Sequence, residues 1–98
     1  MAESNDLIHQ PLRLKIMAAL NAARDDDPLD FGRLKALVQA TDGNLSTHLS
    51  TLEGAGYVRI EKDFIGKKPR TRVAITRAGA TAFREHIAYL RDLIDNAD

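Results

Sequence analysis

The chain has 98 residues, a length that fits one domain with a modest hydrophobic core. It contains no cysteine, which excludes a disulfide framework and a thiolate metal site, and its 14 basic and 14 acidic residues cancel. No apolar run approaches the ~18 residues of a membrane-spanning helix and no segment matches a secretory signal, so we expect a cytoplasmic protein without membrane contact.

The first predicted helix covers residues 12–23, after a polar N-terminal segment that we expect to fray. Pro11 suits its first turn, where a missing N–H costs nothing, and strong helix formers follow. The helix ends at an acidic run, residues 25–27, and Pro28, because carboxylates oppose the negative end of the helix dipole. We interpret the acidic run as a solvated loop; a metal site is the less favoured alternative.

Two short helices separated by a tight turn are predicted next, a helix-turn-helix arrangement. The first covers residues 31–38 and has Asp30 as its N-cap, after a short apolar segment that could form one bridge of a strand. The second begins at Thr41 or Asp42. The apolar face of the first helix consists of Leu34, Leu37 and Val38.

The second of these helices lies within residues 41–58, TDGNLSTHLSTLEGAGYV. Leu45, Leu49 and Leu52 recur at the spacing of one narrow apolar face, and Gly56 marks the helix end. The opposite side carries short, neutral side chains, which form helices poorly but let another surface come close. We interpret the stretch as a recognition helix; a merely solvated face is the alternative. Its outward and flanking residues include Asn44, Ser46, Thr47, His48 and Thr51.

A β-hairpin follows, because the apolar period changes from 3.6 to 2. Val58, Ile60 and Phe64 share one strand face, although Lys62 breaks the pattern, and a second alternating run follows a loop at residues 65–72. The basic residues of this loop are Lys67, Lys68, Arg70 and Arg72.

Positive charge is concentrated on this hairpin. Residues 57–77 contain seven basic and two acidic residues, whereas the rest of the chain contains seven basic and twelve acidic ones. The local sign of charge matters more than the total when one face meets a polyanion. A hairpin tip that is only solvated is the alternative.

The last predicted helix runs from an N-cap at Thr76 to about residue 96 and carries two adjoining apolar stripes. A helix that closes a small domain needs only one stripe against its own core, so the second predicts a homodimer. The alternative is that the first helix covers both stripes within one chain. The predicted dimerisation residues are Phe83, Ile87, Tyr89, Leu90, Leu93 and Ile94.

Three motifs, IHQPLRLKIMAAL, NLSTHLSTLEGAGYV and VAITRAG, together resemble the winged-helix DNA-binding regulators, close to the MarR and ArsR groups. The resemblance covers about residues 7–93. It implies a recognition helix in the major groove of double-stranded DNA and a wing over the backbone or minor groove. The positions that would face DNA are Asn44, Ser46, Thr47, His48 and Thr51 on the helix, and Lys67, Lys68 and Arg70 on the wing. This helix differs from recognition helices that discriminate strongly between DNA sequences, because it lacks Arg and Lys, the usual bidentate partners of guanine.

We therefore expect one mainly α domain over residues 1–98, with a small β-hairpin and a winged helix-turn-helix fold, acting as a dimeric transcriptional regulator. No Ser–His–Asp constellation, Gly-rich phosphate loop or metal-ligand spacing is present, so we expect neither an enzyme nor a cofactor or metal. We find no sensory domain in the sequence, so the sequence does not indicate whether the protein binds an effector ligand. The alternative is a winged-helix module for protein–protein contact.

Overall fold

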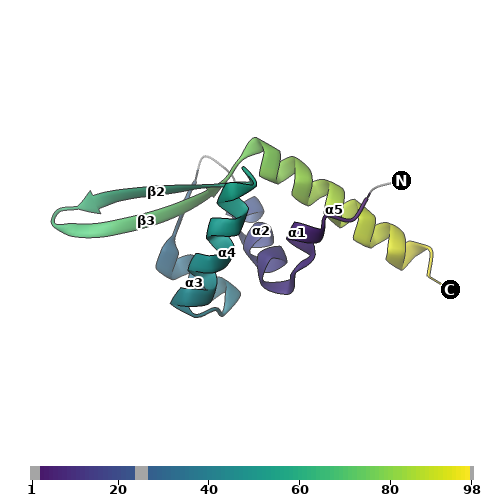
Figure 1. Ribbon diagram of the computed structural model, residues 1–98, viewed down its shortest axis with the longest axis horizontal. Helices are drawn as coiled ribbons and strands as arrows, with labels where there is room; N and C mark the ends of the chain where they lie inside the picture. Colours follow the sequence, from purple (N-terminus) through teal and green to yellow (C-terminus); the bar gives the residue numbers. More distant parts are fainter. Residues whose placement is uncertain (1–2, 24–26, 98) are drawn as a thin grey trace.

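The computed structural model describes residues 3–23 and 27–97. The chain is mainly helical with a three-stranded antiparallel sheet of order β1-β3-β2, which confirms the predicted fold class (Figure 1). The elements are α1 (Asp6–His9), α2 (Pro11–Ala23), β1 (Leu29–Asp30), α3 (Phe31–Val38), α4 (Asp42–Gly54), β2 (Val58–Ile65), β3 (Lys68–Ile75) and α5 (Arg77–Asp95). The molecule measures 56 × 25 × 21 Å, with the β2–β3 hairpin at one end and the C-terminal end of α5 at the other.

One hydrophobic core lies among the helices and the base of the hairpin. Its buried residues are Ile8, Ile16, Met17, Leu20, Leu34, Val38, Leu45, Leu49, Leu52, Val58, Val73, Ile75 and Phe83. The prediction for α3 is corrected at one position, because Leu37 is 56% exposed while Leu34 and Val38 are buried.

A separate short helix, α1, precedes the predicted first helix; we expected residues 1–6 to fray, and Asp6 of that segment begins α1. The break falls at Gln10, whose ψ of 130° is extended, because a residue before proline is pushed out of the helical region. Asn5 fastens α1 to distant parts of the chain. Its backbone N–H donates to Nδ1 of His86 at 3.1 Å, and its side-chain amide donates to the Tyr57 hydroxyl at 3.0 Å.

The hairpin strands are longer than predicted. We expected a loop over residues 65–72, but β2 and β3 pair up to Ile65 and Lys68, so only Gly66 and Lys67 form the turn. Gly66 has a φ of 61°, which suits the first central position of a type II′ hairpin turn. Pro69 is tolerated in β3 because β1 pairs only with the far end of that strand, which leaves the outer edge beside the proline open.

Of the acidic run predicted as a loop or metal site, only Asp27 lies within the described residues, and it is exposed. Asp25 and Asp26 lie outside them. Among residues 3–23 and 27–97, no group of three or more His, Cys, Asp or Glu side chains could hold a metal ion. In the same residues, no helix has the length and apolar character needed to cross a membrane.

Candidate nucleic-acid interface

The orientation of α4 is set by its inner face and its first turn. Leu45, Leu49 and Leu52 are buried in the core, as the spacing predicted. The hydroxyl of Thr41 caps the helix by accepting the backbone N–H of Asn44 at 3.1 Å. Because the core holds three positions over two turns, the opposite face of α4 must point to solvent.

The outer face of α4 is neutral and exposed. Its exposed predicted contacts are Asn44, Ser46, Thr47 and Thr51. The hydroxyl of Thr51 donates to the carbonyl oxygen of Thr47 at 3.3 Å. The side chains of Asn44, Ser46 and Thr47 form no hydrogen bond with any other described residue. Their polar atoms are thus available to a partner that approaches the helix closely.

His48 differs from these four residues because it is half-buried and its side chain contacts Arg13 of α2. Its Nδ1 lies 3.2 Å from a terminal guanidinium nitrogen of Arg13, and guanidinium can only donate, so Nδ1 is the acceptor. Arg13 also donates to the carbonyl oxygen of Leu7. The contact of Arg13 with His48 joins the flank of α4 to α2.

The two arginines of the wing are engaged by acidic side chains. Nε of Arg70 donates to Oδ1 of Asp63 at 2.8 Å, and a second bond joins the same two groups. Arg72 lies 3.5 Å from the carboxylate of Asp63 and 3.8 Å from that of Glu61. The hydrogen bond from Arg70 lowers the pKa of Asp63, so the carboxylate stays ionised near neutral pH. Much of the charge of these arginines is therefore balanced within the wing.

The register of the strands places the cations of the wing on two faces. Arg70 and Arg72 share one face with their acidic partners, whereas Lys62, opposite Thr71, lies on the other. That second face borders α4 across a groove of about 260 Å³. The groove is lined by Phe31, Ser46, Leu49, Ser50, Ile60, Lys62 and Thr71. Sequence reasoning omitted Lys62, although its even spacing from Val58 already placed it on the inner face.

Lys67 and Lys68 are exposed at the tip of the wing, as predicted. Lys67 occupies the turn itself, and Lys68 begins β3. The structure thus places Lys62 in the groove beside the small polar face of α4, whereas Lys67 and Lys68 lie farther out at the tip. Lys68, opposite Ile65, is on the same face of the wing as Arg70. The structure does not bring Arg70 or Arg72 to the face that borders α4.

The predicted dimerisation residues divide by their exposure. Phe83 is buried in the core of its own chain, whereas Leu93 is 51% and Ile94 72% exposed. The half-buried members are Ile87, Tyr89 and Leu90. Both α2 and α1 pack against α5, so the chain itself covers much of the two apolar stripes. The apolar surface that remains lies at the distal end of α5.

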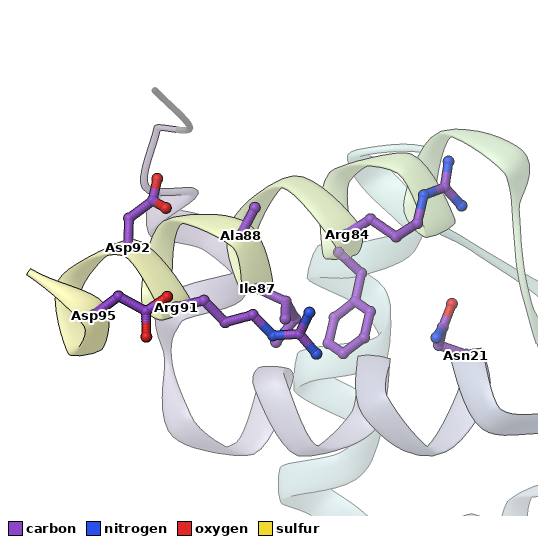
Figure 2. Close-up of a pocket in the computed structure, with 8 residues that line it drawn as sticks. Asn21, Arg84, Ile87, Ala88, Arg91, Asp92 and Asp95 are labelled. Atoms are coloured by element: carbon purple, nitrogen blue, oxygen red, sulfur yellow. The ribbon is translucent and has the colours of Figure 1, made fainter.

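An open groove of about 590 Å³ separates α5 from α2 (Figure 2). Its lining residues are Asn21, Phe83, Arg84, Ile87, Ala88, Arg91, Asp92 and Asp95. Ile87 and Arg91 point toward α2, whereas Ala88 and Asp92 point to the opposite side of α5. The charged side chains at its rim have both signs, so the groove has no preference for a ligand of one charge.

Comparisons with known proteins agree with this architecture. A family model described as a winged helix DNA-binding domain matches residues 12–94. An uncharacterized protein of Methanocaldococcus jannaschii is 33% identical over 92 residues, which cover 94% of this chain and 97% of that protein. The transcriptional regulator homologue protein from Pyrococcus horikoshii OT3 has a TM-score of 0.84 and 33% identity, over 94% of this chain and 88% of that one. A MarR-family transcriptional regulator from Silicibacter pomeroyi has a TM-score of 0.72 and 27% identity, over 91% of this chain and 57% of that one.

Proposed function

The chain belongs to the winged helix DNA-binding domain family, as its three motifs predicted, and on this premise we propose that it regulates transcription as a dimer bound to double-stranded DNA. The observation that carries this proposal is that the neutral polar face of α4 adjoins the lysine-bearing face of the wing. A helix face of this kind fits the major groove, and lysines fit phosphates. The family model describes a DNA-binding domain and not an enzyme.

In this proposal α4 enters the major groove. Asn44 can form the bidentate pair with adenine that amide side chains favour, and the hydroxyls of Thr47 and Thr51 can reach base edges or phosphates. No side chain on this face is long, so the helix backbone must come close to the base pairs. The preference for one sequence over random DNA then depends on few direct contacts.

The wing supplies affinity through the phosphates. Lys62, Lys67 and Lys68 are exposed cations on the inner face and tip, and no described carboxylate forms an ion pair with them. Arg70 and Arg72 reach phosphates only if they exchange their contacts with Asp63 and other acidic partners. We therefore assign the larger share of the wing's affinity to the lysines.

A salt titration tests the function. Binding to a duplex recovered by selection from a random pool should weaken steeply with salt, and Lys62→Gln with Lys67→Gln should flatten the slope by roughly 0.9 per lost phosphate contact. Arg70→Gln is the matched control, because it removes a charge from the opposite face, and should change the slope less.

Asn44→Ala should weaken binding to the selected duplex more than to random DNA, by about 1–3 kcal/mol.

A protein–protein module is the alternative function for the same surfaces. Counterion release from DNA gives a steep, linear dependence of log affinity on log salt, which a protein partner of neutral charge does not share. Failure to bind any duplex at about 50 mM salt would favour this alternative and contradict our proposal.

A further inference from the structure

The tip of the wing carries exposed apolar side chains as well as lysines. Phe64 is 68% exposed and Ile65 60% exposed, at the last two positions of β2 before the turn. Successive side chains of a strand point to opposite faces, so the end of the ribbon is apolar on both sides. Pro69 stands opposite Phe64 and adds to the apolar surface on the inner face.

This surface is unusual for a hairpin that projects into solvent. Sheet edges and tips are normally protected by charged residues, because exposed apolar strands promote aggregation. Both side chains are mostly exposed, so burial of Phe64 and Ile65 contributes little to the stability of the fold, although Ile65 borders an open pocket that Phe31 also lines. A partner that covers the tip would account for both side chains.

We propose that the wing tip is an apolar wedge that enters the minor groove of bound DNA and bends the duplex, with Phe64 as the inserting side chain. Proteins that use the minor groove insert Phe, Ile or Pro between base steps and partly unstack them, and the resulting bend brings more of the duplex against the protein. The proposal rests on the proposed function and adds a mode of binding and a source of sequence preference to it.

Charge complementarity identifies DNA as the occupant. Lys67 and Lys68 flank the apolar tip, and Lys62 lies two residues before Phe64 on the same strand face. Asp63, the carboxylate nearest the tip in β2, is bound by Arg70, so it does not repel a phosphate as an unpaired carboxylate would. An apolar centre surrounded by lysines fits stacked bases bordered by phosphates.

The geometry of the wing suits the minor groove. The ribbon ends in a two-residue turn, so only the side chains at its tip, and not the two strands side by side, would have to enter a minor groove of about 6 Å. Phe64 lies on the face that borders α4, so a duplex held by α4 passes Lys62 before it reaches Phe64. The wedge thus acts on base pairs beside the segment that α4 contacts.

A wedge would also supply sequence preference that α4 lacks. The outer face of α4 has no Arg or Lys to pair with guanine. Flexible pyrimidine–purine steps, such as TA, are unstacked more easily than stiff A-tracts, so inserting Phe64 favours them without a hydrogen bond to any base. We expect a selected binding site to contain such a step under each wing.

Energy transfer between dyes at the two ends of a selected duplex of about 30 base pairs measures the bend. The parent protein should raise the transfer efficiency, and 2-aminopurine placed at the TA step should brighten as it unstacks. Phe64→Ser with Ile65→Ser should bind a duplex that stays straight, and should lose about tenfold in preference for the TA step over an AA step. Lys67→Gln, the matched control, should weaken binding but keep the bend.

The outcomes distinguish a failure of the proposed wedge from a failure of the proposed function on which it rests. Binding of the parent with a straight duplex and unchanged 2-aminopurine fluorescence would overturn the wedge alone, as would bending by the double serine variant. No binding to any duplex would overturn the proposed function as well. The melting temperature of the variant checks its folding, and the fluorescence of the parent complex tests the wedge without any variant. A parent dimer that dissociates in the serine variant without DNA would assign the tip to a second copy of the chain and overturn the proposal.

Discussion

His86 is fully buried on α5, and both of its ring nitrogens are occupied. Nδ1 accepts the backbone N–H of Asn5, and Nε2 lies 3.2 Å from Nδ1 of His9. A neutral His86 can accept at Nδ1 and donate from Nε2, but a protonated ring would place a second proton against the Asn5 N–H. Burial lowers the pKa of His86 and the nearby His9 lowers it further, while Asp6 opposes the shift. The attachment of α1 to α5 therefore requires a neutral imidazole.

The lowered pKa of His86 predicts that stability decreases in mild acid. The folded state binds fewer protons than the unfolded chain, so this contribution is complete above the unfolded pKa of about 6.5 and is lost as the pH falls through that value toward the folded pKa. Thermal melts followed by circular dichroism at pH 8 and about pH 5 should show a lower Tm in acid. His86→Gln, which still offers an acceptor to Asn5, should reduce this difference. If the Tm falls equally between the two pH values in parent and variant, groups other than His86 cause the loss of stability.

Gly79 is required by close packing between the start of α5 and the backbone of Tyr57, just before β2. A Cβ at this position would overlap the carbonyl oxygen of Tyr57, which accepts the backbone N–H of Thr76 at 3.0 Å. Because the obstacle is backbone rather than a flexible side chain, Gly79→Ala should destabilise the fold by about 1–3 kcal/mol. Gly54→Ala is the control, because a Cβ there meets nothing within 4 Å, and it should stabilise by about 0.5–1 kcal/mol. Urea unfolding measures the free energy of unfolding of both variants. Similar changes in this free energy for the two variants would contradict the packing argument.

At the scale of elements, α3 and α4 end in the same way with different residues. Gly56 follows α4 with a φ of 79°, and Gln39 follows α3 with a φ of 56°. Each left-handed residue donates its N–H to a helix carbonyl, as in a Schellman motif. Gln39→Gly should relieve backbone strain and stabilise the protein by about 0.5–1 kcal/mol, whereas Gly56→Ala should destabilise it by about 1–2 kcal/mol. Chemical unfolding at one pH measures both; a destabilised Gln39→Gly variant would show that its side chain makes a compensating contact.

The sequence predicted the elements whose signals are local. The N-caps Asp30, Thr41 and Thr76 and the three inward leucines of α4 lie where the pattern placed them, and the fold class followed from their order. The outer half of the wing was missed because β3 there has polar or charged residues on both faces, which leaves no apolar period. Its pairing depends on partners in the other strand, such as Asp63 with Arg70.

The short helix α1 was missed partly for a related reason. Asn5 caps α1 locally, by accepting the backbone N–H of Ile8 at 3.1 Å, and sequence reasoning overlooked this signal. The other partners of Asn5 are 52 and 81 residues away, so no local pattern could indicate them. The same limit applied to the candidate site. The even spacing of Lys62 from Val58 could have placed it on the inner face, but the face of Arg70 depends on the length and register of β3, which a predicted loop over residues 65–72 left undefined.

The whole molecule is elongated, and its two ends differ in character. The wing projects from one end, and the distal end of α5 projects from the other (Figure 1). A two-fold axis near the end of α5 would leave both copies of α4 and both wings on the outside. Successive major grooves lie about 34–36 Å apart, so such a dimer would bind an inverted repeat with half-sites at that spacing. Because α1 and α2 already cover the proximal part of α5, the contact must rely on its last turns.

The dimer proposal predicts the effect of adding charge to those last turns. Leu93 and Ile94 are exposed in one chain, so Leu93→Glu with Ile94→Glu should leave the fold intact but place four carboxylates in the contact, where burying unpaired charge is unfavourable. Sedimentation equilibrium should find a dimer for the parent and a folded monomer for the variant, and the monomer should bind an inverted-repeat duplex much more weakly because it loses the second half-site. Leu37→Glu is the matched control, because Leu37 is a comparably exposed leucine on α3, and it should remain dimeric. A parent that is monomeric at concentrations where it occupies both half-sites would show that α5 does not form the dimer in solution.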